Sequence, residues 1–138
     1  MMRVNTYLFF DGNCEAAFKF YERVLGGKIE TMMPHAGSPA ESSVPSAWAS
    51  KILHAHMTIG GTVLMASDAP PAHSPGKPQG FAVSLEVATA AEADRVFAEL
   101  SRGGKVTMPI AETFFAKRFG MCSDQFGIPW MVNCTEGR

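Results

Sequence analysis

The sequence predicts an α+β fold built from two tandem βαβββ units, and three observations support that class. Runs rich in β-branched and aromatic residues, typical of strands, alternate with two runs whose apolar residues recur at helical spacing. Each helical run ends in Gly-Gly-Lys followed by a β-branched residue, at residues 26–29 and again at 103–106. The same offset pairs Glu15 with Glu92. A repeat of this length indicates two copies of one unit rather than a solenoid.

Length and composition favour one compact domain in a reducing compartment. A chain of 138 residues is expected to bury roughly 68% of its unfolded surface. Twelve basic and thirteen acidic residues give a net charge of −1, which argues against a nucleic-acid partner. The apolar start is too short for a membrane span and has no signal-peptide pattern, so no membrane partner is expected. The scattered Cys14, Cys122 and Cys134 indicate buried, reduced thiols in a cytoplasmic protein.

The first unit begins with a predicted strand at residues 4–10. Asn13 is the expected N-cap of a helix over residues 14–25, and a glycine pair ends that helix. A short strand over residues 28–33 follows. Residues 34–50 then carry three prolines and several serines without a period of either kind, which predicts a long loop and a candidate lid.

Residues 51–68 predict a β-hairpin that turns at Gly60 and Gly61. With that turn, His56 lies opposite Met65 and His54 lies opposite Ser67. Alternation along the strands places a fully apolar set on one face: Leu53, Ala55, Met57, Ile59, Leu64 and Ala66. The other face is mixed and carries two imidazoles: His54, His56, Thr58, Val63, Met65 and Ser67.

The second unit follows a proline-rich break at residues 69–80. Thr89 and Glu92 have the spacing of a capping box, which opens a helix with an apolar face that a glycine pair ends. The strands of this unit are predicted at residues 81–87, 105–108, 119–123 and 130–134. The two repeats thus cover about residues 3–68 and 80–135 of a single domain over residues 1–138.

Each unit has one helix to cover one face of its sheet, so the other face is left bare. Two such units are expected to curl around a shared concavity. The first strand of each unit then presents three residues to this concavity: Asn5, Tyr7 and Phe9 in the first unit, and Ala82, Ser84 and Glu86 in the second.

Several short motifs are specific enough to compare with a known family. They are 10–17 (FDGNCEAA), 20–21 (FY), 25–27 (LGG), 54–55 (HA), 65–68 (MASD), 112–114 (ETF), 119–120 (FG) and 124–133 (DQFGIPWMVN). With these motifs the chain resembles the vicinal oxygen chelate superfamily, which holds glyoxalase I, bleomycin-resistance proteins and extradiol dioxygenases. It is most similar to the PhnB-like branch, often labelled "3-demethylubiquinone-9 3-methyltransferase domain". The resemblance covers nearly the whole chain except the two proline-rich loops, and the closing Asp-x-Phe-Gly-x-Pro-Trp run is its most specific part.

The resemblance implies a glyoxalase/bleomycin-resistance fold and suggests where a metal would bind. Superfamily enzymes hold a divalent metal with two His and two Glu or a close variant. In this chain those positions fall at Asn5, Met65, Ala82 and Met131, none of which is a ligand for zinc, nickel or iron. We therefore expect no metal and no cofactor.

A displaced metal site is the alternative. His54 and His56 have the spacing of two ligands on one strand, and a third ligand would come from Glu112, Glu86 or His35. The protein would then be a metal-dependent lyase or isomerase, or a dioxygenase-like enzyme. The structural alternative is that both imidazoles bond to neighbouring strands or solvent, and the resemblance supports a functional role for His54 more than for His56.

Strand alternation and the family resemblance together give the candidate site. His54 and Glu112 are the candidate catalytic residues, with Glu112 as a base or a clamp on a cationic or hydroxylated ligand. Trp130 falls on the core side by alternation and is left out. The candidate ligand-binding residues are Asn5, Tyr7, Phe9, His56, Met65, Ser67, Glu86, Phe114, Phe115 and Met131.

The predicted function is metal-independent binding of a small molecule. A structural or regulatory dimer without a ligand is a further possibility. The methyltransferase label has no support in the chain, because no glycine-rich nucleotide loop follows a first strand and the length is too short for a nucleotide-binding fold. A homodimer is expected, because open sheets leave edges that small domains seldom tolerate bare and because superfamily members generally pair.

Overall fold

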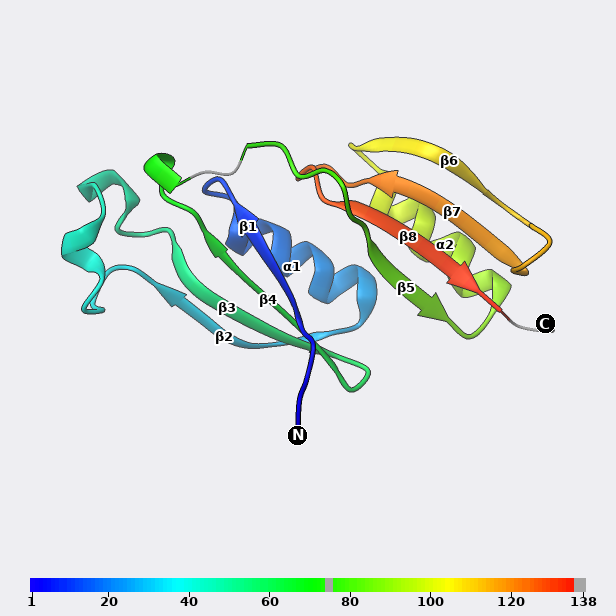
Figure 1. The fold of residues 1–138 in the computed structure, drawn as a ribbon, viewed down its shortest axis with the longest axis horizontal. Helices are drawn as coiled ribbons and strands as arrows, with labels where there is room; N and C mark the ends of the chain where they lie inside the picture. Colours follow the sequence, from blue (N-terminus) through cyan, green and yellow to red (C-terminus); the bar gives the residue numbers. More distant parts are fainter. Residues whose placement is uncertain (74–75, 136–138) are drawn as a thin grey trace. The chain divides into compact units, whose positions relative to one another are not determined.

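The computed structural model describes residues 1–73 and 76–135 and contains the predicted repeat. The chain divides into two compact units, Met1–Gly76 and Lys77–Arg138. Each unit contains one helix and one four-stranded sheet in the order βαβββ (Figure 1). The predicted α+β class and the two βαβββ units are therefore confirmed. That both repeats form one domain stays a prediction.

In unit 1, the helix covers one face of a mixed sheet. The strand order is β1-β4-β3-β2, with β1 parallel to β4 and the other neighbours antiparallel. Helix α1 packs against β2, β3 and β4. The elements are β1 (Thr6–Phe10), α1 (Cys14–Leu25), β2 (Lys28–Pro34), β3 (Ile52–Ile59) and β4 (Thr62–Asp68), with 3-10 turns at Glu41–Ser43, Ser46–Trp48 and Pro71–His73.

The end of α1 explains the first glycine pair. Gly26 ends the helix in a left-handed conformation with φ 72°, which favours glycine. Gly27 lies close to β3, since a Cβ there would stand 2.8 Å from both the Cγ1 atom of Ile59 and the sulfur of Met57. The helix can therefore return into β2 only where a side chain is absent.

The start of α1 differs from the prediction. Asn13 makes no capping hydrogen bond with its side chain within the described part of the chain. Instead, the Oδ1 atom of Asp68 accepts from Gly12 N and Cys14 N, both at 2.9 Å, and its Oδ2 atom accepts from Ile52 N at 2.8 Å. A carboxylate distant in sequence thus caps the helix and fixes the start of β3, which a local capping rule could not foresee.

The hairpin forms in the predicted register, with His56 opposite Met65 and Ile59 opposite Thr62. The expected side for Leu53 is wrong. Ile52 is buried and Leu53 is half-buried on the other side, because the pairing of β2 with β3 shifts next to Pro34. This irregularity reverses the alternation at the beginning of β3.

Unit 2 has the same arrangement, with strand order β5-β8-β7-β6 and β5 parallel to β8. The Oγ1 atom of Thr89 accepts from Glu92 N at 3.1 Å, as the capping box predicted. Trp130 is 1% exposed and donates from Nε1 to Asp124 at 2.8 Å, so its predicted place on the core side is confirmed. The elements are β5 (Val83–Val87), α2 (Ala90–Ser101), β6 (Lys105–Ala111), β7 (Arg118–Ser123) and β8 (Pro129–Cys134).

Strand ends are the main differences from the predicted elements. The first strand of each unit begins later than expected, at Thr6 and at Val83. Strand β6 instead runs further, past Pro109 to Ala111. Proline is tolerated there because β6 is an edge strand and its pairing with β7 is irregular at that point.

The three cysteines, Cys14, Cys122 and Cys134, are buried, as the sequence predicts, and all are free. Neither of the two helices in the described ranges has the length and apolarity needed to cross a membrane.

Candidate functional site

The face of the first sheet opposite α1 carries half of the predicted site residues. Strand alternation directs one set of side chains away from the helix, and the register brings them side by side. Tyr7 pairs with Met65, which pairs with His56, while Phe9 pairs with Ser67. We call this surface the unit 1 face, defined by Tyr7, Phe9, His54, His56, Met65 and Ser67.

An aromatic cluster occupies part of the unit 1 face. The ring of Tyr7 lies 5.1 Å from that of Phe9 and 5.9 Å from that of His54 between centroids. The hydroxyl of Tyr7 is 3.5 Å from His54 Nδ1, at the outer limit of a hydrogen bond. Phe9 is 53% exposed. An open aromatic surface beside a weakly held imidazole can stack on a ligand ring and offer it a polar contact.

His56 is the second imidazole of the unit 1 face. Its Nε2 atom is buried and has no hydrogen-bond partner among the described residues. A buried polar atom without a partner costs about 1–3 kcal/mol, so such an atom points to a ligand or water that satisfies it. The structural alternative, in which both imidazoles bond to neighbouring strands, is not seen for this nitrogen.

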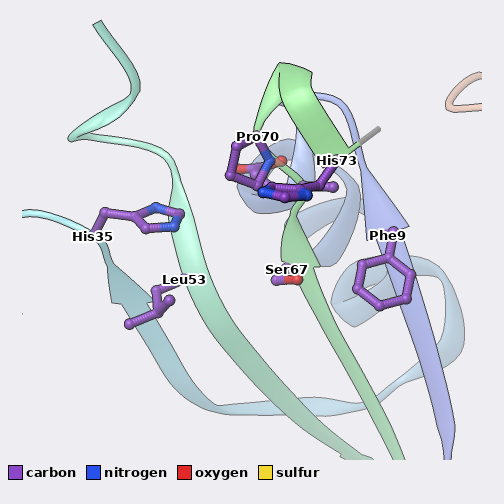
Figure 2. A pocket seen from close by; sticks show the side chains of 8 residues that line it. Phe9, His35, Leu53, Ser67, Pro70 and His73 are labelled. Atoms are coloured by element: carbon purple, nitrogen blue, oxygen red, sulfur yellow. The ribbon is translucent and has the colours of Figure 1, made fainter. Parts of the chain in front are cut away.

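A pocket of about 310 Å³ lies at one end of the unit 1 face. Figure 2 shows His35 and Leu53 at one side, Phe9 at the other, and Pro70 and His73 near Ser67. The described lining also includes Asp68 and Ala69. The walls are mainly apolar and a few polar groups converge on them, as is typical of small-molecule sites.

Of this lining, the predicted ligand-binding residues include Phe9 and Ser67, and His35 was named as a possible third ligand of the displaced metal site. Strand alternation could not place His73, because it lies in a proline-rich segment without a period. Alternation placed Leu53 on the core side, which the shift next to Pro34 reverses. An Asp directly after an apolar strand was the one available signal for a buried carboxylate at Asp68.

The other predicted ligand-binding residues have varied positions. Asn5 lies before β1 and is exposed. Met131 is half-buried in the second sheet, between Ser84 and Met121. Glu86 is exposed in the same sheet. Glu86 and Met131 thus belong to unit 2, whereas the unit 1 face and the pocket belong to unit 1.

Glu112, Phe114 and Phe115 lie in the loop between β6 and β7, also in unit 2. Glu112 is exposed, and Phe114 is 93% exposed. Phe115 packs edge-on against Phe119 with 5.0 Å between ring centroids. The proposed pairing of Glu112 with His54 joins residues of different units and stays a prediction.

Two of the cysteine thiols, those of Cys14 and Cys122, are unsuited to nucleophilic chemistry. Burial, and secondarily the charges of Asp68 and Glu15, raise the pKa of Cys14 to about 12. Burial and then the charge of Asp124 raise the pKa of Cys122 to about 11. Because the thiolate is the reactive form, these two groups are held unreactive at neutral pH.

The superfamily metal does not fit the residues at its expected positions. Met65 and Met131 supply thioethers, and their neighbours in the parallel strands are Tyr7 and Ser84. Asn5 lies outside its strand, and Ala82 has no donor atom. Hard and borderline divalent metals prefer imidazole and carboxylate ligands. No group of three or more His, Cys, Asp or Glu within residues 1–73 and 76–135 is arranged to hold a metal.

Comparisons with known proteins agree with this fold. The model of the Glyoxalase/Bleomycin resistance protein/Dioxygenase superfamily matches residues 3–132. Protein YjdN of Escherichia coli (strain K12) is 35% identical over 145 residues, covering 98% of this chain and 97% of that protein. The crystal structure of PA1353 from Pseudomonas aeruginosa is 44% identical, with a TM-score of 0.90 and 99% of each chain covered.

A further match represents the PhnB-like branch that the sequence resembles. The PhnB protein of Bacillus cereus, which carries a 3-demethylubiquinone-9 3-methyltransferase name, is 24% identical with a TM-score of 0.81, covering 96% of this chain and 99% of that one. At this identity the likeness concerns the fold. Because the family model matches nearly the whole chain and both βαβββ units are present, the chain belongs to the Glyoxalase/Bleomycin resistance protein/Dioxygenase superfamily.

Proposed function

We propose that this protein binds a small molecule on the unit 1 face and in the adjoining pocket, without a metal. The observation that carries the proposal is the pocket of about 310 Å³, which shares Phe9 and Ser67 with the unit 1 face. Binding pockets commonly measure roughly 300–1,000 Å³, so a ligand with a single ring is the expected size. The exposed ring of Phe9 provides a surface on which such a ring stacks.

Metal independence is supported by the chemistry of the residues at the superfamily positions. Two thioethers, an amide and an alanine methyl group replace the imidazoles and carboxylates of the metal-binding members. Methyl transfer, which the name of the Bacillus cereus protein implies, is not part of this proposal. The sequence has no glycine-rich loop that would bind the nucleotide portion of a methyl donor.

Elemental analysis of tag-free protein, combined with a thermal-shift screen, tests this proposal. We expect less than stoichiometric zinc, nickel, manganese or iron, and stabilisation by aromatic and hydroxylated compounds that persists in EDTA. Binding raises the apparent stability by RT ln(1 + [L]/Kd), so a tenfold excess over Kd contributes about 1.4 kcal/mol. About one metal per chain, lost in His54→Ala, would overturn the metal-free proposal.

The second candidate is a metal-dependent lyase, isomerase or dioxygenase-like enzyme with a displaced site. His54 and His56 lie two residues apart on the unit 1 face, and Nε2 of His56 has no partner in the described part of the chain. Titration with zinc, nickel and manganese separates the two candidates. Binding near one equivalent that needs both histidines and Glu112 favours the enzyme.

We also propose that the protein forms a homodimer. Each four-stranded sheet ends in two edge strands, and exposed Val106 and Met108 make β6 an apolar edge. Size-exclusion chromatography with light scattering at micromolar concentration should give twice the chain mass of 14.9 kDa. A monomer at that concentration would contradict this part of the proposal.

A further inference from the structure

The imidazole of His35 has a fixed tautomer. Its Nδ1 atom lies 3.0 Å from the carbonyl oxygen of Lys51, which also accepts from the backbone nitrogen of His35 at 2.9 Å. The hydroxyl of Ser38 donates to the carbonyl of His35 at 2.7 Å. A carbonyl oxygen only accepts, so Nδ1 carries the proton, and Nε2 of the neutral ring is an acceptor.

This acceptor belongs to the pocket. His35 is 4% exposed and is part of the pocket lining, and Figure 2 shows its ring beside Leu53. Nε2 makes no hydrogen bond to the described part of the chain. A ligand that fills the pocket takes this acceptor away from water, so a donor on the ligand satisfies it, whereas an acceptor group placed there would leave it unpaired.

The charge of the pocket wall also disfavours an anionic ligand. Asp68 is 2% exposed, and its carboxylate accepts three backbone hydrogen bonds, which hold it in the wall. The described lining residues include neither lysine nor arginine. An anionic ligand would therefore meet a carboxylate without a guanidinium or ammonium group to balance it.

The remaining surface fits a small apolar body. Phe9, Leu53 and Pro70 supply apolar area, and Ser67 adds a hydroxyl that can donate or accept. Figure 2 shows Phe9 and His35 on different sides of the pocket. A ligand with a ring on Phe9 can thus direct a polar substituent toward His35.

We infer that the pocket recognises small hydroxyl- or amino-bearing compounds through a hydrogen bond donated to Nε2 of His35, and that it discriminates against carboxylates. This inference rests on the proposed small-molecule function and names the ligand class for that site. His35 is the specificity-determining residue, Asp68 disfavours anions, and Phe9 holds the apolar body.

Four matched probes test the inference on the full-length protein by NMR titration. Benzyl alcohol and benzylamine carry donors, benzyl methyl ether lacks one, and phenylacetate is an anion. We expect benzyl alcohol to bind about tenfold more tightly than the ether, the effect of one polar contact, and phenylacetate to bind most weakly. The relative affinities of benzyl alcohol and benzylamine show whether the pocket prefers a neutral or a cationic donor.

Two variants assign the preference to His35. In His35→Asn the side-chain amide can still donate to Lys51 O but leaves no acceptor where Nε2 was, so the preference for alcohol over ether should vanish. In His35→Gln the amide oxygen reaches toward the Nε2 position, so part of the preference should remain. Circular dichroism and thermal melting verify that both variants fold.

The outcomes separate this inference from the proposed function. Equal binding of alcohol, ether and carboxylate to the wild-type protein would overturn the inference while leaving small-molecule binding intact. A preference that persists in His35→Asn would overturn the role of His35. If none of the four probes shifts resonances of the unit 1 pocket at millimolar concentration, both the inference and the proposed site are overturned.

Discussion

The two units share one fold, but the exposed faces of their sheets differ in chemistry. All four histidines of the chain lie in unit 1, two of them on the unit 1 face. The second sheet instead carries a row of methionines in register, with Met108 beside Met121 and Met121 beside Met131. The helix, the glycine pair and the core pattern are common to both units, so they specify the fold. The helix-free face is not constrained by the core, and there the units have diverged.

Each unit also has one buried aspartate, and the two differ in what they connect. Asp68 joins the start of α1 to the start of β3 and forms part of the pocket wall. Asp124 accepts from Phe126 N, Ile128 N and Trp130 Nε1, all within six residues. Asp68 therefore links structure to the site, whereas Asp124 stabilises a local turn and the core.

Removing the aspartates should give the largest effects. Asp68→Ala and Asp124→Ala each leave three donors without an acceptor, and one unsatisfied buried donor costs about 1–3 kcal/mol. We expect each to lower the free energy of unfolding by about 3 kcal/mol or more in urea titrations. Asp68→Asn keeps an oxygen for Gly12 N and Cys14 N and loses only the acceptor for Ile52 N, so its loss should be intermediate.

The variants of the two aspartates should also differ in their effect on ligand binding. Wherever the proteins remain folded, changes at Asp68 should alter ligand binding and changes at Asp124 should not. Equal effects of the two aspartates on binding would mean that the site is not confined to unit 1.

Substitutions in the two glycine pairs should lower the free energy of unfolding by less than the aspartate substitutions do. A Cβ on Gly104 would clash with the backbone of Ser123 and Asp124, which cannot move aside. A Cβ on Gly27 would meet mainly the side chains of Ile59 and Met57. Overpacking costs typically about 1–3 kcal/mol, so Gly104→Ala should lie at the upper end and Gly27→Ala at the lower end. Chemical denaturation of both variants measures the order, and a reversed order would contradict it.

The buried thiols predict a loss of stability at alkaline pH. The folded pKa of Cys14 is about 12 and that of Cys122 about 11, above the ordinary 9.0. Below pH 9 both thiols are protonated in the folded and unfolded states. As the pH rises through 9 toward 12, the unfolded chain loses these protons first, so the free energy of unfolding falls.

Urea titrations at pH 8, 9.5 and 10.5 measure this slope, with Cys14→Ala and Cys122→Ala as controls that should reduce it. Native protein should also resist a thiol reagent at pH 8 and react after unfolding. Rapid modification of the native protein would show that burial does not protect these groups.

Substitutions of the two imidazoles of the unit 1 face should have the smallest effects. The family resemblance favours His54, so His54→Ala should weaken ligand binding about tenfold, roughly 1.4 kcal/mol, and His56→Ala should weaken it less. His56 has the unpartnered nitrogen, so His56→Leu should leave unfolding stability unchanged or raised. Isothermal titration with a compound from the screen and parallel melting curves measure both. A stronger effect at His56 would reverse the ranking.

Sequence patterns predicted the elements of the fold because each pattern acts locally. The repeated Gly-Gly-Lys, the hairpin turn at Gly60 and Gly61, and the capping box at Thr89 all involve residues near one another in the chain. The cap that Asp68 provides for α1 and the shift near Pro34 could not be predicted in this way. They depend on contacts between segments that only the folded chain brings together.

The candidate site was predictable to the extent that it follows strand alternation. Tyr7, Phe9, His56, Met65 and Ser67 lie where alternation and the hairpin register place them. The pocket was not predictable, because His35 and His73 reach it from irregular segments and Leu53 reaches it through the local shift in β3. Only part of the site follows a period, and that part is the unit 1 face.

Backbone amide chemical-shift mapping tests most directly that the binding chemistry lies in unit 1. Uniformly labelled protein in EDTA would be titrated with benzyl alcohol, and the shifted resonances assigned. We predict saturable shifts for the amides of Phe9, His35, Leu53, Ser67 and Ala69, with residues of β6 and β7 unaffected. Saturable shifts centred on Met108, Met121 and Met131, or binding that requires an added metal, would contradict the account.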